Sequence, residues 1–535
     1  MAANKKIPKG TAKSSKSLEK YALISVFDKS GIIDFAKIIS LLGYKIISTG
    51  GTAKVLIDAG LKVIPIQEIT GNPESFDGRM KTISFQIEGG ILFDRRNRKH
   101  IKEAKKLKIK NIEIVVCNLY PFEQTIANPK VKVGDAIESI DVGGPTMIRA
   151  AAKNFKNVLV IVDPKDYESL STLLHSSILL TNRLRQKLAA KAFRHLSFYD
   201  SQISIYLEPN KNKFPQEIAI PGRKKIDLRY GDNPHQKSAV YIEPNTNSPL
   251  ANLEKVTGRD LSATNFTDIF SGLESVRIFK EPCAVVIKHN SPSGIALGSS
   301  TSQALERAVE ADPQSAFGGV IVLNKPIDFK TAKTFAAFKE ESGVLIDIIA
   351  APAIEDKASE FIKNVRKSTG IYIFGKIPGK RSNKKHLRFF DGGFVMQDWD
   401  DRFNSLNWKV AGKFKPTKKQ LEQMKIAWKF IGRIRSNTII IVDKDLPMTR
   451  GIGSGQTSRV RATKIALEQA GKLARHAILA SDSFFPFADS VKLAAKAGIG
   501  AIIQQGGSVN DQASIDMANK AKIPMVFTGQ RKFWH

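Results

Sequence analysis

The chain has 535 residues, a length that exceeds one hydrophobic core and predicts two to four domains. Hydrophobic residues make up 42% of it and charged residues 25%, as in an ordinary globular protein, and no apolar run approaches the length of a membrane span. The two cysteines, Cys117 and Cys283, exclude a disulfide framework and a cysteine-rich zinc site, and they favour a reducing, cytoplasmic compartment.

The net charge of the chain is +32, because it contains 83 lysine and arginine residues and only 51 acidic residues. Nucleic-acid binding and a generally basic surface both account for such an excess. Residues 1–18 contain five lysines and no acid, lack the apolar core of a secretory signal, and predict a disordered tail. Residues 95–110 hold nine basic residues and no interleaved aromatic residue, which favours a solvated helical face over a base-stacking platform.

The first half of the chain alternates between strand patterns and helix patterns. The predicted strands are 21–27, 45–48, 62–66, 113–118 and 157–162. The predicted helices are 32–42, 53–59, one opened by the sequence 141–145, and a helical stretch over 166–207. This order predicts a parallel sheet with right-handed crossovers.

Two motifs of this half carry chemistry. The sequence Thr49-Gly50-Gly51-Thr52 lies between a strand and a helix N-terminus, where backbone N–H groups and the helix dipole favour a phosphate. An ordinary glycine turn is the alternative. Tyr120, Asp141 and Lys153 supply a donor, a carboxylate and a cation, and we expect them near one edge of the sheet.

In the second half, which follows a polar linker predicted at 209–226, the residues after one strand stand out. The apolar run 284–287 predicts a buried strand that delivers Lys288 and His289 into a turn over 290–294. An imidazole can take a proton near neutral pH, and an adjacent ammonium stabilises developing negative charge. A solvated lysine beside a histidine that hydrogen-bonds the turn is the alternative.

Other patterns of the second half are more ambiguous. The predicted strands are 320–323, 346–352 and 439–442. Asp347 is a candidate for a buried acid. The glycine-rich stretch 451–459 is neither a P-loop nor a dinucleotide fingerprint, since Gln456 occupies the place of the third glycine. The aromatic stretch 481–487, predicted between helical segments, fits either a core or an apolar slot for a flat ring.

Taken in order, the motifs resemble a known family. The first half contains Ser-Val-x-Asp-Lys, Thr-Gly-Gly-Thr-Ala, Asn-Leu-Tyr-Pro-Phe and Ala-Ala-Ala-Lys-Asn. The second half contains Leu-Arg-Tyr-Gly-x-Asn-Pro-His-Gln, Lys-His-x-x-Pro-x-Gly, Ser-Ala-Phe-Gly-Gly and Ser-Asp-x-Phe-Phe-Pro-Phe. Over residues 20–535, the chain resembles the bifunctional purine-biosynthesis enzymes, in which an IMP cyclohydrolase domain precedes a formyltransferase domain.

The resemblance implies an α/β protein with a methylglyoxal-synthase-like parallel-sheet domain at 19–208 and a formyltransferase region of two cytidine-deaminase-like subdomains at 227–535. It implies formyl transfer from the co-substrate 10-formyltetrahydrofolate to 5-aminoimidazole-4-carboxamide ribonucleotide, and then dehydrative ring closure to inosine monophosphate. It also implies an intertwined homodimer with formyltransferase sites at the interface. The resemblance implies no bound metal, no tightly bound cofactor, and neither a membrane nor a nucleic acid as a partner. It leaves the binding of a monovalent cation open.

Position by position, the resemblance implies site residues. Catalysts of formyl transfer are Lys288, His289 and Asn437, and catalysts of ring closure are Lys81, Tyr120, Asp141 and Lys153. Residues for the ribonucleotide and its imidazole carboxamide are Arg229, Tyr230, Arg531, Asn265, Gly318 and Asp347. The folate slot is lined by Ile452, Phe485 and Pro486. The phosphate cradle and the adjoining ring-closing site add Ser25, Lys29, Gly50, Gly51, Thr52 and Thr82.

The chain departs from the family pattern at three positions. Ser84 and Phe155 stand where the family usually has histidines beside the cyclohydrolase site, and Ser293 stands where bacterial members often have cysteine. A formyltransferase with a degenerate cyclohydrolase domain is therefore one alternative to the bifunctional enzyme. A nucleic-acid-binding protein on the same scaffold is a second alternative, motivated by the net charge.

Overall fold

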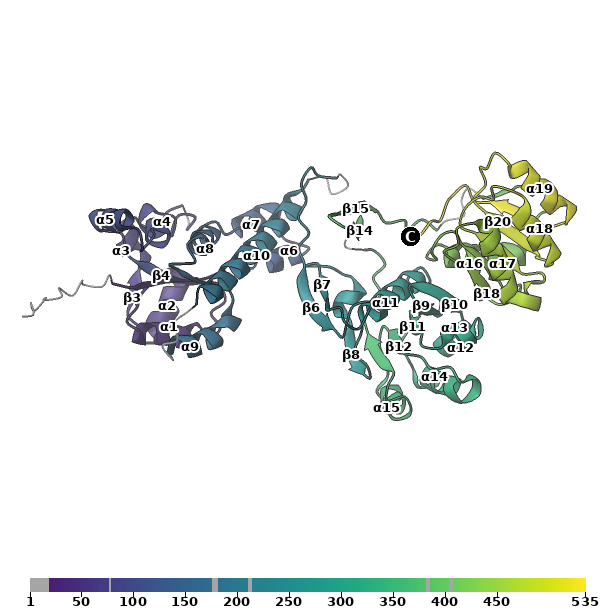
Figure 1. Cartoon of the computed structure of the whole chain (residues 1–535), viewed down its shortest axis with the longest axis horizontal. Helices are drawn as coiled ribbons and strands as arrows, with labels where there is room; N and C mark the ends of the chain where they lie inside the picture. Colours follow the sequence, from purple (N-terminus) through teal and green to yellow (C-terminus); the bar gives the residue numbers. More distant parts are fainter. Residues whose placement is uncertain (1–18, 77, 176–180, 210–213, 382–384, 404–407) are drawn as a thin grey trace, which may run out of the picture. The chain divides into compact units, whose positions relative to one another are not determined.

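The chain forms two compact units in the computed structural model (Figure 1). The residues described are 19–535 without 77, 176–180, 210–213, 382–384 and 404–407. The tail predicted at 1–18 and part of the predicted linker therefore lie outside the described residues. Unit 1 contains Met1–Gly222 and Glu243–Asn245, and unit 2 contains Arg223–Ile242 and Thr246–His535.

Unit 1 is built on a five-stranded sheet in which every pair of neighbouring strands is parallel. In sheet order the strands are β3 (Val63–Pro65), β2 (Lys45–Ser48), β1 (Tyr21–Val26), β4 (Ile112–Asn118) and β5 (Leu159–Ile161). The central strands are almost continuously apolar and buried, as expected for a parallel sheet covered by helices. The predicted parallel sheet is confirmed.

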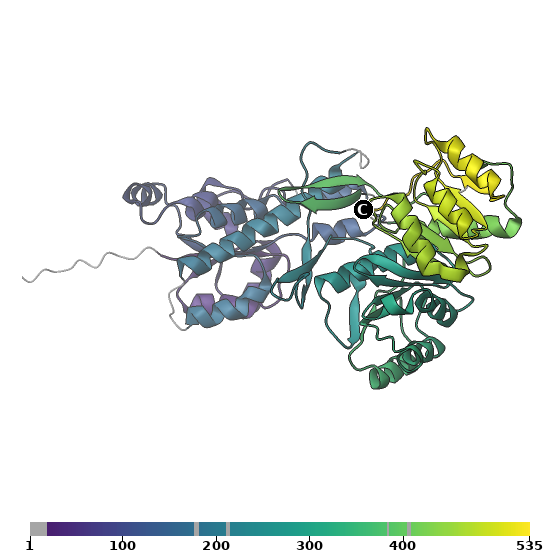
Figure 2. The ribbon, with the colours of Figure 1, turned by 45° about the vertical axis from the view of Figure 1, so that its right-hand side comes forward.

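The helices of unit 1 connect and cover these strands. They are α1 (Ile32–Leu41), α2 (Gly50–Asp58), α3 (Ile66–Thr70), α4 (Phe85–Leu92), α5 (Arg98–Lys106), α6 (Phe122–Ala127), α7 (Val133–Glu138), α8 (Gly143–Lys153), α9 (Tyr167–His175) and α10 (Asn182–Leu207). The long helix α10 packs against α8 and β5 (Figure 2). The predicted helical stretch 166–207 is thus present as α9 and α10.

Unit 2 contains two six-stranded mixed sheets. The first consists of β10 (Ser291–Leu297), β9 (Cys283–Lys288), β11 (Val320–Leu323), β12 (Ile348–Ala351), β13 (Gly370–Ile373) and β8 (Glu254–Thr257). The second consists of β16 (Lys409–Val410), β21 (Met525–Phe527), β20 (Ala501–Gln504), β19 (Ile478–Ser481), β17 (Ile439–Val442) and β18 (Thr449–Gly453). Two separate hairpins are β6–β7 (Arg223–Leu228 and Ser238–Ile242) and β14–β15 (Lys385–Phe390 and Gly393–Asp398).

The two sheets repeat one topology. In each, a central strand (β9 or β17) pairs antiparallel with both neighbours, and two parallel pairings follow. The helices around them are α11 (Ala263–Val276), α12 (Thr301–Glu310), α13 (Pro313–Ala316), α14 (Phe329–Ser342), α15 (Asp356–Val365), α16 (Lys418–Ile431), α17 (Arg459–Ala470), α18 (Asp489–Lys496) and α19 (Asp511–Lys520). Edge strands β10 and β18 meet where Leu297 N–H donates to the Pro447 carbonyl at 2.9 Å. Unit 2 is therefore two subdomains joined at these edges.

The glycine-rich stretch 451–459 owes its pattern to packing. Gly451 and Gly453 lie in β18, and a Cβ at either would overlap a backbone carbonyl of α17. Gly294 in β10 lies against α12 in the same way, at its Ala308 carbonyl. Glycine lets strand and helix backbones approach in both subdomains, so these residues need no bound phosphate to explain them.

Two predictions of local structure are wrong. Residues 290–294 do not form a turn: Ser291 begins β10, and the turn consists of His289 and Asn290. The serine, proline and glycine there have turn composition, but pairing with β9 decides the structure, and proline is tolerated because β10 is an edge strand. The aromatic stretch 481–487 follows a strand, β19, and precedes a helix, α18. Every helix in the described part of the chain is too short or too polar to cross a membrane.

Candidate functional site

The loops after β1 and β2 meet at the carboxyl-terminal edge of the sheet in unit 1. The hydroxyls of Ser25 and Thr49 lie 2.9 Å apart. The buried hydroxyl of Thr52 accepts a hydrogen bond from the Val26 N–H at 3.1 Å and donates one to the Val26 carbonyl at 2.9 Å. Thr52 therefore fastens α2 to the end of β1, and its hydroxyl does not face an anion in the loop.

The first turn of α2 has the features of an anion cradle. Thr49 is its N-cap, and Gly50, with a φ of 39°, and Gly51 are exposed. The Lys29 Cε lies 3.9 Å from the position that a Cβ on Gly51 would take. An ammonium beside an exposed helix N-terminus fits a phosphate. The structure thus brings Ser25, Lys29 and the two glycines together, as the sequence predicts.

Three predicted ring-closing residues lie together at the start of α8. The Asp141 Oδ1 accepts the Gly144 N–H at 2.8 Å, and its carboxylate also accepts the backbone N–H of Tyr120. Burial raises the pKa of Asp141, and these hydrogen bonds oppose that rise. Thr82 is buried against the same helix start, where a Cβ on Gly143 would overlap its hydroxyl. Tyr120 is half exposed and so accessible to a substrate.

The two predicted ring-closing lysines occupy different places. Lys81 precedes Thr82 in the chain, and its Nζ lies 2.6 Å from Glu74 Oε1. Lys153 is exposed and is the last residue of α8, about 15 Å along the helix from Gly143 at 1.5 Å per residue. Lys81 is therefore joined through Thr82 to the start of α8, with its ammonium on Glu74, and Lys153 lies at the opposite end of the helix.

The two positions that lack the family's histidines have structural roles. Ser84 is the N-cap of α4, and its hydroxyl accepts the Ile87 N–H at 3.1 Å. Phe155 packs against the hydrophobic core of unit 1. Both substitutions are therefore accommodated by the fold.

Asn118, at the end of β4, is a residue of this edge that sequence reasoning missed. Its Oδ1 accepts the N–H groups of Phe27 at 2.7 Å and Asp28 at 2.9 Å, and its amide donates to the Asp28 carbonyl at 3.0 Å. It fixes the loop that carries Lys29. The sequence feature that could have indicated Asn118 is its position at the end of a predicted strand.

In unit 2, Lys288 and His289 lie where β9 turns into β10. The Lys288 Nζ donates to the Phe317 carbonyl at 2.8 Å. His289 and Asn290 have φ values of 53° and 61°, so both central residues of the hairpin turn are left-handed, and the His289 side chain is exposed. Asp268 of α11, which the sequence did not single out, is buried and accepts the Asn290 N–H at 2.6 Å.

Gly318 and Asp347 lie beside this turn. Gly318, with a φ of 70°, follows the carbonyl that Lys288 contacts, and the Asp347 N–H donates to the Gly319 carbonyl at 3.0 Å. The prediction that Asp347 is a buried acid is wrong, because its side chain is 31% exposed. Its Oδ2 pairs with Arg259 at 2.6 Å. It precedes β12 at the sheet edge, where solvent and a cation both reach it.

Asn437 lies in the second subdomain, in a loop organised by a buried carboxylate. Its amide donates to the Gln456 carbonyl at 2.8 Å. The carboxylate of Asp482 accepts the Thr438 N–H at 3.0 Å and pairs with Arg459 at 3.2 Å. Burial raises the pKa of Asp482, and the hydrogen bond from Ser436 and the charge of Arg459 oppose that rise.

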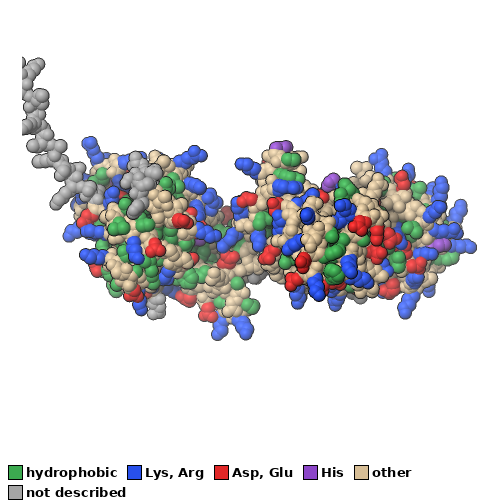
Figure 3. Space-filling model, turned by 90° about the horizontal axis from the view of Figure 1, so that it is seen from below, with side chains coloured by type: hydrophobic (Ala, Val, Ile, Leu, Met, Phe, Trp, Pro, Cys, Tyr) green, Lys and Arg blue, Asp and Glu red, His purple; other side chains and the backbone are tan. Residues whose placement is uncertain are grey.

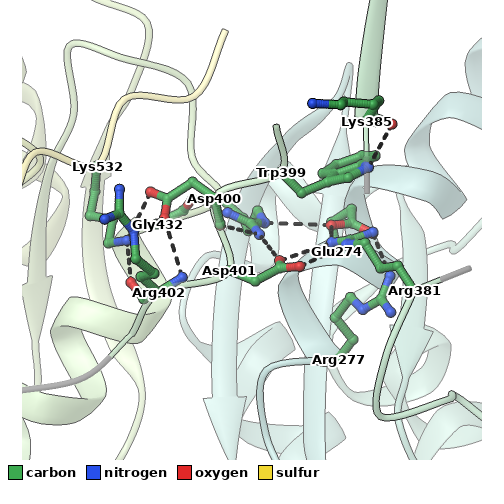
Figure 4. A network of polar contacts seen from close by, with 11 residues as sticks. Glu274, Arg277, Arg381, Lys385, Trp399, Asp400, Asp401, Arg402, Gly432 and Lys532 are labelled. Carbon is green, nitrogen blue, oxygen red and sulfur yellow. Dashed lines mark hydrogen bonds and ion pairs between the residues drawn. The ribbon is translucent and has the colours of Figure 1, made fainter. Parts of the chain in front are cut away.

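The C-terminal residues run beside the Asn437 loop. The Ser436 N–H donates to the Trp534 carbonyl at 2.9 Å, and the Lys532 N–H donates to the Asp482 carbonyl at 2.8 Å. The Lys532 ammonium is buried and lies 2.9 Å from the Asp400 carboxylate (Figure 4). Its neighbour Arg531 is exposed, so the buried Lys532 anchors the segment that carries this guanidinium at the surface.

The remaining predicted ribonucleotide contacts gather at the start of α11. Arg229 stacks on the ring of Tyr230 at 4.6 Å and donates to its hydroxyl at 2.9 Å. The Tyr230 carbonyl accepts the Ala263 N–H at 2.9 Å. Asn265 completes a capping box with Ser262, so its side chain is engaged in the first turn of the helix.

Of the three residues expected in the folate slot, two lie in the hydrophobic core. Ile452 is 8% exposed and Phe485 is fully buried. Pro486 is half-buried, and the adjacent Phe487 is 63% exposed. The accessible apolar surface of this stretch is therefore at Pro486 and Phe487.

The basic stretch 95–110 is mostly a solvated helix, as predicted. Only Ala104 of α5 is buried. Arg95 is an exception, because its guanidinium donates to the carbonyls of Gly90 and Phe93 at 2.9 Å each and so caps α4. The face seen in Figure 3 carries lysine and arginine side chains interspersed with acidic ones. Among the described residues, no group of three or more His, Cys, Asp or Glu side chains is placed to hold a metal ion.

Two protein-family models match the chain. The model described as MGS-like domain matches residues 31–146, and the model described as AICARFT/IMPCHase bienzyme matches residues 151–469. Together they confirm the predicted fold class, a methylglyoxal-synthase-like parallel-sheet domain followed by the mixed-sheet region.

Curated relatives match nearly end to end. A bifunctional purine biosynthesis protein PurH from Oceanobacillus iheyensis is 42% identical over 97% of this chain and 100% of its own length. The protein of the same name from Acetivibrio thermocellus is 44% identical over 96% of this chain and 100% of its own. A solved structure described as the crystal structure of ForH is 34% identical, covers 35% of this chain and 95% of that one, and has a TM-score of 0.32.

Proposed function

Because the chain belongs to the family of AICARFT/IMPCHase bienzymes, it catalyses the last two steps of inosine monophosphate synthesis, and we propose which residues perform each step. Its substrates are a nucleotide and a formyl-folate, and we propose 10-formyltetrahydrofolate as the donor. Formyl transfer to the amine of 5-aminoimidazole-4-carboxamide ribonucleotide belongs to unit 2. Dehydrative ring closure belongs to unit 1.

The observation that carries the assignment of formyl transfer is the Lys288–His289 turn. The amine of the substrate is a poor nucleophile, because the ring and the carboxamide withdraw its electrons. As nitrogen attacks the formyl carbon, it loses a proton, and the folate nitrogen that leaves gains one. We propose that the exposed His289 takes the amine proton and that Lys288 and Asn437 stabilise the charge on the formyl oxygen.

For binding, we propose that Arg229, Tyr230 and Arg531 hold the ribonucleotide and that Gly318 and Asp347 contact its imidazole carboxamide. Arg229 and Arg531 are exposed cations suited to a phosphate. Asn265 would position the start of α11 through its capping box. For the folate ring we propose Pro486 and Phe487, with the buried Ile452 and Phe485 supporting them.

For ring closure, we propose that the phosphate lies on the α2 cradle and that Lys81, Thr82, Tyr120 and Asp141 surround the closing ring. The reaction is intramolecular, so holding the reactive conformer lowers much of its barrier. A cation is then needed for the developing oxyanion. Lys81 directly precedes Thr82, whose hydroxyl lies at the start of α8, and Lys153 is included on the resemblance of its motif alone.

Lys81→Ala is expected to lower ring closure about a hundredfold, the usual effect of removing one preorganised oxyanion donor. Lys153→Ala is expected to lose most ring closure too, whereas Lys156→Ala, a nearby exposed lysine, should not. The measurement is conversion of supplied formylated intermediate to inosine monophosphate, with formyl transfer as the internal control. Equal rates for Lys153→Ala and Lys156→Ala would remove Lys153 from the site. A parent enzyme that fails to close the ring would leave a formyltransferase with a degenerate first domain.

Gly51→Asp is expected to raise KM for the formylated intermediate in ring closure about tenfold, equivalent to roughly 1.4 kcal/mol. The added carboxylate would oppose the substrate phosphate at the helix N-terminus. The backbone tolerates a side chain there, since among the described residues only Lys29 Cε, at 3.9 Å, lies within 4 Å of a Cβ at this position. Gly51→Asn, of the same size without the charge, is the control. If both variants change KM equally, the effect is steric and the phosphate lies elsewhere.

We propose that the chain acts as a homodimer whose formyltransferase sites lie at the interface. Two observations support this. Lys288 and Asn437 lie in different subdomains. Among the described residues, Lys288 donates to the Phe317 carbonyl and Asn437 to the Gln456 carbonyl, each within its own subdomain. The β14–β15 hairpin exposes Phe389 at 72% and Phe390 at 60%, an apolar surface that a second copy would cover.

We propose a cytoplasmic location, which is supported by the two free, buried thiols Cys117 and Cys283. Nucleic acid is not proposed as a partner, because the site motifs of both activities are present and the basic stretch 95–110 contains no interleaved aromatic residue on which a base could stack.

A further inference from the structure

The hairpin turn that carries His289 is left-handed at both central residues, and His289 is not one of the residue types that usually occupy such positions. A two-residue turn of this kind needs positive φ at both central positions, and glycine or asparagine usually occupies them. Here His289 and Asn290 have φ values of 53° and 61°. A Cβ disfavours this region, so the surroundings must hold the turn in place.

Asp268 is the side chain that holds it. It lies in α11, is 4% exposed, and its Oδ1 accepts the Asn290 N–H at 2.6 Å. The backbone N–H of His289 also acts to lower the pKa of this carboxyl. Ser271, three residues further along the same helix, donates to the Asn290 side chain at 3.3 Å. Both the backbone and the side chain of Asn290 are thus held by α11, the backbone by a buried carboxylate.

The packing of α11 explains why Asp268 reaches the turn. Gly272 lies one helical turn after Asp268 and therefore on the same face. A Cβ there would overlap Val322 of β11 and would lie 3.3 Å from Ile287 of β9. Because glycine lets α11 approach the strands closely, Asp268 sits directly against the end of β9.

We propose that Asp268 is a positioning residue for formyl transfer, which acts by fixing the left-handed backbone of the His289–Asn290 turn and thereby the place of the imidazole. This inference rests on the proposed role of His289. Burial raises the pKa of Asp268, and the Asn290 N–H and the charge of His289 oppose that rise, so the environment of the turn favours the carboxylate that accepts the Asn290 N–H.

The test is steady-state kinetics of formyl transfer with Asp268→Ala and Asp268→Asn in the full chain. Asp268→Ala should lower kcat at least about tenfold, because a misplacement of about 1 Å can cost about a hundredfold. KM for the ribonucleotide should stay within about threefold, since its proposed anchors are elsewhere. Asp268→Asn, which keeps an acceptor oxygen, should lose less. Ring closure should be unchanged.

Rescue separates positioning from a merely structural role. Glycine adopts positive φ without support, so Asp268→Ala should cost much less kcat in an Asn290→Gly background than in the parent. The matched control is Asp443→Ala, which removes another buried carboxylate that accepts two backbone N–H groups of a turn, those of Asp445 at 2.8 Å and Leu446 at 2.9 Å. It should lower thermal stability with no specific loss of kcat.

The outcomes are distinct. A folded Asp268→Ala enzyme with kcat within about threefold of the parent would overturn the inference. So would an equal loss of kcat in the parent and Asn290→Gly backgrounds. If His289→Ala itself leaves formyl transfer intact, the proposed function fails instead, whatever Asp268 does.

Discussion

His289→Ala is expected to lower formyl transfer at least about a hundredfold while ring closure continues at the parental rate. General-base assistance usually contributes about a hundred- to ten-thousandfold, and the substrate amine is too poor a nucleophile to dispense with it. The His289 side chain is exposed at the end of β9, so it can reach a bound substrate. Ring closure is spared because its proposed residues all belong to unit 1.

The measurement is both half-reactions on one purified variant, with calorimetric binding of the ribonucleotide as a third readout. Binding should change little, because the proposed anchors Arg229 and Arg531 are intact. His235→Ala is the control, since His235 is also an exposed histidine of unit 2. If His289→Ala retains formyl transfer within about threefold, well short of the contribution of a general base, His289 is only a turn residue and the assignment fails.

The sequence was most informative where local pattern and tertiary environment agree. The strands at 320–323 and 439–442 have the predicted bounds, since short apolar runs bordered by polar residues indicate buried strands. The parallel sheet of unit 1 followed from alternating strand and helix periods. In both cases the local pattern of apolar residues is enough to determine the type of secondary structure.

The sequence was least informative where a residue far away in the chain determines the local conformation or the burial of a side chain. The turn at His289–Asn290 depends on Asp268, which lies 22 residues before the Asn290 N–H that it accepts. Asp347 is paired rather than buried because Arg259, 88 residues away, reaches it. Composition around 290–294 predicted a turn, and strand pairing overrode it. No window of local sequence contains these contacts.

Within the candidate site, residue types were predicted better than the direction of side chains. The glycines and Lys29 of the phosphate cradle lie together, but the Thr52 hydroxyl points into the fold. Likewise Phe485 is buried and Phe487 is exposed, although both belong to one aromatic motif. Which side chain faces a ligand depends on the register of strand and helix, which the motif alone does not give.

Glu274→Ala is expected to lower the free energy of unfolding of unit 2 by about 3–5 kcal/mol, the usual cost of removing one partner of a buried ion pair. Glu274 is 1% exposed in α11 and lies at the centre of the network in Figure 4. The cations around it are Arg277 at 3.0 Å, Arg381 at 2.9 Å and Arg433 at 3.5 Å. Without the Glu274 carboxylate, these three guanidinium groups would lack a counter-charge that they now share.

Asp401 cannot compensate for that loss alone. It already pairs with Arg381 at 2.9 Å and Arg433 at 2.8 Å, and it is half exposed. Although burial by itself raises the pKa of Glu274, the hydrogen bond and charge of Arg381 hold it below its ordinary value. The stabilisation from a depressed carboxyl pKa is present at neutral pH and is lost as the pH falls through the folded-state pKa.

Denaturant unfolding followed by tryptophan fluorescence measures this effect, because all four tryptophans belong to unit 2. Glu274→Gln keeps the shape and an acceptor without the charge, so it should cost less than Glu274→Ala. Asp445→Ala is the exposed control: it removes a surface ion pair with Lys419 and should change stability by no more than about 1 kcal/mol. A Glu274→Ala effect as small as that of Asp445→Ala would show that the three arginines are solvated without Glu274. The segments that carry Arg381 and Trp399 would then be held together by packing of the guanidinium on the indole ring, at 3.9 Å, rather than by the charge of Glu274.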